Sequence, residues 1–232
     1  MQVRVAADAV GAASLAADSI ARRLRFAVLR RGLASVAFSG GTTPAAMLAE
    51  LATMTVPWQY VQVFQVDERV APDGDPRRNL RLLEVLPVAA RQLHAMPVTV
   101  RDLHAGARRY ASSLPDRFDV VHLGLGDDGH TASWPPGDPV IRSERRVDLC
   151  SEYSGTVRMT LTPRVVNAAR SRLVLAAGSS KRPMLQRWLA GDGSLPVHSV
   201  RRTDTLVIVD RAGAPEEMGE SIKSRRSTLG SG

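Results

Sequence analysis

The amino-acid sequence predicts an α/β fold in which helices cover a largely parallel sheet. Short apolar or β-branched runs, typical of buried strands, alternate along the chain with longer segments of helical periodicity. Alternation at this spacing is typical of βα units, whose strands line up in parallel. The chain has 232 residues, 44% of them hydrophobic, which is enough to bury one sizeable core. We therefore expect a single α/β domain over residues 1–212.

Each expected element follows from a local pattern. The runs that we expect to form strands cover residues 33–38, 60–66, 118–123, 171–177 and 205–209. The segments with helical patterns cover residues 9–30, 44–52, 77–86, 103–114, 163–169 and 181–189. Pro44 and Pro163 each stand in a first helical turn, where a missing amide hydrogen is tolerated. Residues 213–232 lack apolar periodicity, and we expect them to form a mobile tail.

The basic character of the chain does not by itself indicate a nucleic-acid-binding protein. The net charge is +8, and because lysine occurs only at positions 181 and 223, arginine makes up nearly all of the 31 basic residues. These arginines are scattered, and four Phe, three Tyr and three Trp offer few side chains for base stacking. We expect no nucleic-acid partner and a preference for anionic small molecules.

The single cysteine, Cys150, cannot form an intramolecular disulfide, and no Cys/His cluster has the spacing of metal ligands. We expect Cys150 to be a small buried side chain, and we expect neither a metal site nor a cofactor. Asp8 and Asp18 interrupt the N-terminal stretch, which lacks the apolar run of a signal peptide. Since no segment approaches the roughly 18 apolar residues of a membrane span, we expect a cytoplasmic protein without membrane association, a monomer or a weak homo-oligomer.

Parallel α/β sheets bind ligands beyond the carboxyl ends of their strands, so the loops that follow the apolar runs are candidate sites. The loop after residues 33–38 reads Ser-Gly-Gly-Thr-Thr-Pro and contains Gly40, Gly41, Thr42 and Thr43. Its glycines let backbone amides approach a ligand, and the following helix start adds a positive dipole, so the loop is suited to cradle a phosphate. An ordinary glycine turn capped by Thr42 or Thr43 fits this loop alone equally well.

Two further loops carry charged side chains after expected strands. Asp67-Glu68-Arg69 follows residues 60–66 and is either a solvated turn or a site in which Arg69 binds phosphate and Asp67 orients a neighbour. In residues 124–133, Gly-Leu-Gly-Asp-Asp-Gly-His-Thr-Ala-Ser, glycines place Asp128 and His130 two positions apart. A histidine takes up a proton near neutral pH, and a close carboxylate fixes its tautomer, so His130 is a candidate general base.

Two isolated basic residues complete the set of candidates. Arg158 lies in Arg-Met-Thr, and Lys181 follows Gly-Ser-Ser directly after the expected strand at 171–177. Isolated basic residues usually belong to the solvated surface. Lys181 stands out because lysine is scarce in this chain and because it follows a strand.

Taken in order, these motifs resemble the signature of the 6-phosphogluconolactonases over roughly residues 3–212. The resemblance implies a Rossmann-like fold with helices on both faces, no metal, and hydrolysis of 6-phospho-D-glucono-1,5-lactone to 6-phosphogluconate in the oxidative pentose phosphate pathway. It implies that His130 activates a water for attack on the C1 carbonyl, and that Asp128 or Asp67, between which the sequence does not choose, orients it. The groups implied to bind the phosphate are Gly40, Gly41, Thr42, Thr43, Arg69, Arg158 and Lys181.

Two other functions fit the same motifs. Glucosamine-6-phosphate deaminases share the Asp-Gly-His core, but the segment after His130 here continues to Trp134-Pro135-Pro136 without the carboxylate used in deamination. A non-enzymatic sugar-phosphate sensor is expected to carry a helix-turn-helix segment, and the sequence before Ser39 has none. Trp134-Pro135-Pro136 and Arg78 depart from the lactonase pattern, at positions that bear on the pocket wall and the sugar contacts.

Overall fold

The structure of the protein is a computed structural model, which describes residues 1–216 and 218. A seven-stranded sheet of order β1-β10-β9-β6-β2-β3-β5 forms its centre, and all of its neighbouring strands are parallel. These strands are β1 (Gln2–Ala6), β2 (Ala34–Phe38), β3 (Val61–Gln65), β5 (Leu93–His94), β6 (Val120–Gly124), β9 (Arg172–Ala176) and β10 (Thr205–Asp210). The expected parallel α/β fold is confirmed.

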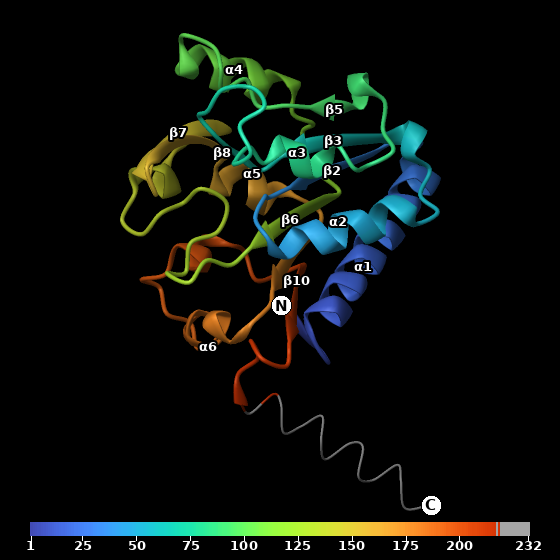
Figure 1. Ribbon diagram of the computed structural model, residues 1–232, viewed down its shortest axis with the longest axis vertical. Helices are drawn as coiled ribbons and strands as arrows, with labels where there is room; N and C mark the ends of the chain where they lie inside the picture. Colours follow the sequence, from blue (N-terminus) through green and yellow to red (C-terminus); the bar gives the residue numbers. More distant parts are fainter. Residues whose placement is uncertain (217, 219–232) are drawn as a thin grey trace, which may run out of the picture.

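Helices cover both faces of this sheet, as expected. One face packs against α1 (Ala9–Arg31), α2 (Thr43–Thr53) and α3 (Leu80–Leu83), and the other against α4 (Leu103–Ser113), α5 (Pro163–Ala168) and α6 (Arg182–Leu189). The two faces bury separate apolar clusters because side chains of a strand alternate: Val36 and Phe38 of β2 join the cluster around α1, and Ala37 joins the other. Figure 1 shows α1 and α2 side by side, with the central strands between them and β7 and β8.

A second, three-stranded antiparallel sheet was not expected from the sequence. It consists of β4 (Asp67–Arg69), β8 (Thr156–Leu161) and β7 (Val147–Tyr153), in that order. The charged triplet at 67–69, expected to be a loop, is therefore a short strand. Its pairing partner lies about ninety residues later in the chain, a distance over which local periodicity carries no signal.

Two other expectations about elements are corrected. The N-terminal strand β1 was missed, although it pairs with β10 along its whole length. The helix expected at 77–86 shrinks to α3, whose first amides, those of Asn79 and Leu80, bond to the carboxylate of Glu68. Pro87 follows closely and disfavours helical backbone in the residue before it, so the segment cannot extend further.

Three residues directly beyond the expected boundary at residue 212 pack against the domain. Gly213, Ala214 and Pro215 are buried, and the amides of Gly213 and Ala214 donate to the backbone oxygen of Asp210. The rest of the segment expected to be a mobile tail, apart from Glu216 and Met218, lies outside the described residues. Among the described helices, none is both long and apolar enough to cross a membrane.

Candidate active site

A cleft opens at the carboxyl ends of β2, β6 and β9, where the expected site loops converge. It is bordered by β4 and β8 of the second sheet and by the start of α6. Its lining consists of Ser39, Gly40, Gly41, Thr42, Thr43, Pro44, Asp67, Arg69, Asn79, Gly124, Leu125, Gly126, His130, Thr131, Ala132, Arg158, Leu175 and Lys181. The structure thus brings every candidate residue of the sequence analysis to this lining except Asp128, which lies directly behind His130.

The loop from Ser39 to Thr43 turns the chain from β2 into α2 with its backbone exposed to the cleft. Gly41 has a φ of 115°, in the left-handed region that favours glycine. A β-carbon at Gly40 would stand 1.9 Å from Oδ1 of Asn79, so no other residue fits there. Thr42 precedes the helix without a side-chain capping bond, which leaves its hydroxyl available to a ligand. In the described part of the chain, the buried hydroxyl of Ser39 has no hydrogen-bond partner.

His130 is held by Asp128 through its Nδ1 atom. Oδ1 of Asp128 lies 2.5 Å from Nδ1 and also accepts the backbone N–H of His130, at 3.1 Å. Oδ2 accepts the hydroxyl of Tyr153 at 2.7 Å. Partial burial pushes the pKa of Asp128 upward, but the bonds from Tyr153 and His130 outweigh it and hold that pKa at about 2. The carboxylate is therefore charged at neutral pH, and Nε2 of His130 remains available on the cleft side.

Asp67 lies on another wall of the cleft and is not the partner of His130. Its carboxylate accepts the hydroxyl of Ser133 at 2.7 Å, and its backbone oxygen accepts the amide of Asn79 at 2.9 Å. Burial raises the pKa of Asp67, and the bond from Ser133 and the positive charge of Arg158 only partly offset this. The choice between the two carboxylates that the sequence left open is therefore decided by geometry: Asp128 contacts His130.

Two arginines face each other on neighbouring strands at the same side of the cleft. Arg69 of β4 and Arg158 of β8 are register partners. Arg69 donates to Asn79 Oδ1 at 2.7 Å and to the Arg77 carbonyl at 2.8 Å, while burial and the nearby charge of Arg158 lower its pKa. Arg158 is 7% exposed, and among the described residues its buried Nε has no hydrogen-bond partner. The like charges of half-buried Arg69 and buried Arg158 repel each other, and an anion bound between them would reduce that repulsion.

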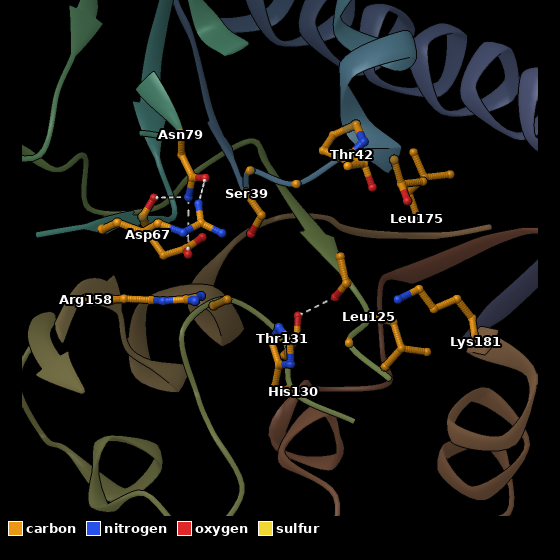
Figure 2. Close-up of a pocket in the computed structure, with 18 residues that line it drawn as sticks. Ser39, Thr42, Asp67, Asn79, Leu125, His130, Thr131, Arg158, Leu175 and Lys181 are labelled. Atoms are coloured by element: carbon orange, nitrogen blue, oxygen red, sulfur yellow. Dashed lines mark hydrogen bonds between the residues drawn. The ribbon is translucent and has the colours of Figure 1, made fainter. Parts of the chain in front are cut away.

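Lys181 belongs to the opposite side of the cleft. Figure 2 shows Arg158 and Lys181 pointing into the cavity from opposite walls, with His130 on a third. The ammonium of Lys181 donates to Asp127 at 2.7 Å, and this bond lowers the pKa of the Asp127 carboxyl. The three cations expected to bind phosphate therefore form two separate groups. One is the pair Arg69 and Arg158, and the other is Lys181 with its carboxylate partner Asp127.

Glu68 supports the site from the core, a role that the sequence did not reveal. It is fully buried, accepts the amides of Arg69 and Asn79 at 2.8 Å each, and forms a 3.0 Å ion pair with Arg78. Arg78 also donates to the carbonyl of Ala71 at 2.9 Å. The unusual arginine at position 78 is thus directed into the protein, where it neutralises Glu68.

Trp134, in the other segment that departs from the lactonase pattern, also lies in the core. Trp134 is fully buried and donates its indole N–H to the carbonyl of Leu161 at 2.8 Å. The chain reaches it through Ala132, whose φ of 51° is unusual for a residue with a side chain, and Ser133 points back to Asp67. The residues after His130 therefore anchor the loop to β8 and do not themselves, beyond Ala132, line the cleft.

Metal-binding and thiol chemistry have little support in this site. Across residues 1–216 and 218, no group of three or more His, Cys, Asp or Glu side chains is arranged to hold a metal ion. Cys150 is buried, as expected, and burial raises the pKa of its thiol to about 11, so the thiolate nucleophile is scarce at neutral pH.

A parallel α/β sheet with a histidine–carboxylate pair and buried cations beyond the ends of its strands is typical of an enzyme for small anionic substrates. The chain belongs to the glucosamine-6-phosphate isomerase/6-phosphogluconolactonase family, whose model matches residues 7–209. This confirms the resemblance inferred from the motifs.

Individual relatives agree with this assignment. A 6-phosphogluconolactonase of Nostoc is 32% identical over 203 residues, which are 81% of this chain and 85% of the relative. One of Mesorhizobium japonicum is 35% identical over 79% of this chain and 83% of its own length. The crystal structure of a 6-phosphogluconolactonase from Shewanella baltica superposes with a TM-score of 0.83 at 25% identity, covering 90% of this chain and 97% of that one. A monomeric glucosamine-6-phosphate deaminase, at 19% identity and a TM-score of 0.79, shares the fold.

Proposed function

We propose that this protein hydrolyses 6-phospho-D-glucono-1,5-lactone to 6-phosphogluconate, the lactonase step of the oxidative pentose phosphate pathway. The observation that carries the proposal is one cleft in which His130, held by Asp128, faces the buried Arg158, whose Nε has no hydrogen-bond partner within residues 1–216 and 218. The His130–Asp128 pair is suited to activate water for hydrolysis, and Arg158 is suited to bind a phosphate. The names of the relatives support the same reaction.

In the proposed mechanism His130 is the general base. Because Nδ1 is hydrogen-bonded to Asp128, Nε2 is the nitrogen that accepts a proton from water as the water oxygen attacks C1 of the lactone. When the tetrahedral intermediate collapses, the bond between C1 and the ring oxygen breaks, and His130 returns the proton to that oxygen. General-base catalysis of this kind contributes on the order of 10²–10⁴-fold. Asp128 keeps the imidazole in the required tautomer and stabilises its protonated form.

Asp67, the other carboxylate considered for orienting His130, has a different proposed role. Its bonds to Ser133 and to Asn79 hold the loop after His130 against β4. Burial raises the pKa of Asp67 and so favours its protonated form relative to that of an exposed carboxyl, and only this form donates a hydrogen bond to a substrate oxygen.

We propose that the substrate's phosphate binds at the junction of the glycine loop and the cationic walls. The backbone of Gly40 and Gly41 and the hydroxyls of Thr42 and Thr43 supply donors at the start of α2. Arg69 and Arg158 supply positive charge from one wall of the cleft. Lys181 supplies it from the opposite wall, where the phosphate replaces part of the hydrogen bonding between Lys181 and Asp127. The arginine pair is the stronger candidate for the main contact, because in the part of the chain that the structure describes Arg158 has no hydrogen bond at Nε to give up.

Several of the other arginines serve the fold, and we propose that the protein has no nucleic-acid partner. Arg172 is fully buried and donates to the carbonyl of Ala169 at 2.8 Å, and Arg146 and Arg202 likewise donate to backbone carbonyls. Arginines used in this way stabilise the chain and are not arranged to follow phosphates. We further propose a cytoplasmic enzyme that is a monomer or a weak homo-oligomer, which sedimentation of the purified protein will test.

The deciding experiment is a lactonase assay with freshly prepared 6-phosphogluconolactone. Release of acid is followed at neutral pH against the spontaneous rate, with unphosphorylated gluconolactone as the control substrate and His130→Ala as the control protein. We expect rapid hydrolysis of the phosphorylated lactone only by the unaltered protein. Ammonia release from glucosamine 6-phosphate without lactone hydrolysis would instead favour the deaminase alternative.

A further inference from the structure

Tyr153 connects the proposed base to the proposed phosphate site, although no motif marks it. Its hydroxyl donates to Asp128 Oδ2 at 2.7 Å and lies 3.2 Å from His130 Nδ1. Its ring meets the imidazole edge-on, with the centroids 5.3 Å apart, and the guanidinium carbon of Arg158 lies 5.1 Å from its centroid on the ring face. The side chain of Tyr153 thus contacts Asp128, His130 and Arg158.

The β7–β8 hairpin aims Tyr153 at these groups. The register between β7 and β8 shifts between Cys150 and Tyr153, and such irregularities redirect the side chains that follow them. The turn after Tyr153 is tight, because Ser154 and Gly155 both have positive φ, of 52° and 77°. The phenol at the end of β7 lies beside the loop that carries Asp128.

We propose that Tyr153 is a positioning residue for the lactonase reaction, which fixes the Asp128 carboxylate against His130 and orients Arg158. The inference rests on the proposed function. The Asp128 side chain is 36% exposed, so burial alone does not hold its rotamer. Oδ1 is held by the ring and the backbone N–H of His130, whereas Oδ2 accepts the Tyr153 hydroxyl, so removing the phenol loosens the Oδ2 side of the carboxylate and its orientation against the imidazole.

Tyr153 remains a donor over the whole working pH range. Burial and the neighbouring Asp128 charge raise the pKa of its hydroxyl to about 12. The titratable and charged groups around it are Asp128 and His130 on the loop and Arg158 on β8. The ring face of Tyr153 makes a cation–π contact with Arg158, and this contact attracts the guanidinium toward the ring.

Two substitutions separate the two contacts. Tyr153→Phe removes the hydroxyl and keeps the ring, so we expect kcat to fall about tenfold with KM nearly unchanged, as for a lost bond to a charged group. Tyr153→Leu also removes the ring, and should in addition raise KM for the phosphorylated lactone several-fold but not for gluconolactone. Tyr60→Phe, at a tyrosine that is 48% exposed and outside the cleft, is the matched control and should leave both constants unchanged.

A double-mutant cycle tests whether Tyr153 acts through Asp128. In an Asp128→Asn background the Tyr153→Phe change should cost less than about twofold in kcat, because the group it positions is already gone. An equal tenfold loss in both backgrounds would overturn the inference, as would Tyr153→Phe with wild-type kcat. If no variant or wild-type protein hydrolyses the lactone at all, the proposed function fails instead, so the two failures are distinguishable.

Discussion

The imidazole of His130 lies against the backbone of Gly126. A β-carbon at Gly126 would stand 2.0 Å from Nδ1 of His130 and 2.8 Å from Oδ1 of Asp128. The loop closes on itself here, since the Gly126 amide donates to the His130 carbonyl at 2.8 Å. The histidine–carboxylate pair therefore fits only over a residue that has no side chain.

Gly126→Ala should consequently inactivate the enzyme without unfolding it. The added methyl group displaces the ring and the carboxylate together, and we expect kcat/KM to fall at least about a hundredfold, a loss comparable to that of the base itself. Gly193→Ala is the matched control, because a β-carbon there meets nothing within 4 Å. Steady-state kinetics and melting temperatures of both variants test this, and near-normal activity of Gly126→Ala would contradict the described loop.

His130→Ala should abolish catalysis while ligand binding persists. It removes the proposed base and leaves the glycine loop and arginines in place, so kcat should fall about 10²–10⁴-fold. Binding of the product, 6-phosphogluconate, measured by calorimetry, should remain near that of the unaltered protein. His104→Ala, on the exposed face of α4, is the control for changes at a histidine outside the cleft. More than about a tenth of wild-type turnover in His130→Ala would rule out the assigned role.

Phosphate recognition should depend on both cationic walls. Arg158→Met and Lys181→Met should each lower kcat/KM for 6-phosphogluconolactone about tenfold to a hundredfold, as expected for a lost charge-assisted hydrogen bond. Gluconolactone offers no charge to either residue, so its hydrolysis should change little. We expect the larger effect at Arg158, whose Nε is unpartnered without ligand. Equal losses on both lactones would show that these residues serve the chemistry or the fold and not the phosphate.

The buried carboxyl of Asp67 should make stability depend on pH in a defined direction. Its folded-state pKa is raised above the usual 3.8, so its contribution to stability is fully present below that value and is lost as pH rises through the folded pKa. Asp67→Asn cannot titrate. The free energy of unfolding of Asp67→Asn should therefore increase relative to that of the wild type as the pH rises from about 3.5 to neutral. Urea denaturation across this range measures the difference, and the opposite trend would mean that the folded pKa is lowered.

Shortening the chain tests where the domain ends. A protein that ends at Ala212 loses the Gly213 amide, which donates to Asp210 Oδ1 at 2.8 Å, and the buried side chain of Ala214. We expect its melting temperature to lie several degrees below that of a protein ending at Met218, given that about 1 kcal/mol shifts a domain of this size by ~2–4 °C. Identical melting curves would support the boundary at residue 212 that the sequence suggests.

Local patterns were sufficient for five of the seven strands of the parallel sheet and for the loops that line the cleft. Buried strands such as β2 and β9 are continuous apolar runs, and the helices α1 and α4 have their own periodicity and start signals. The loop with Asp128 and His130 was also recognisable, because the residues that form the pair are two positions apart and their contact depends on nearby glycines. Information of this kind lies within a few residues along the chain.

The tertiary structure alone decided which groups meet across the cleft. Asp67 and Asp128 were equivalent candidates for His130 until folding directed one of them to Ser133, 66 positions away. Pairing of β4 with β8 brings Arg69 opposite Arg158, and the hairpin places Tyr153 on Asp128, 25 positions back along the chain. These contacts follow from the packing of separate elements on one core, and local sequence periodicity carries no record of such long-range contacts.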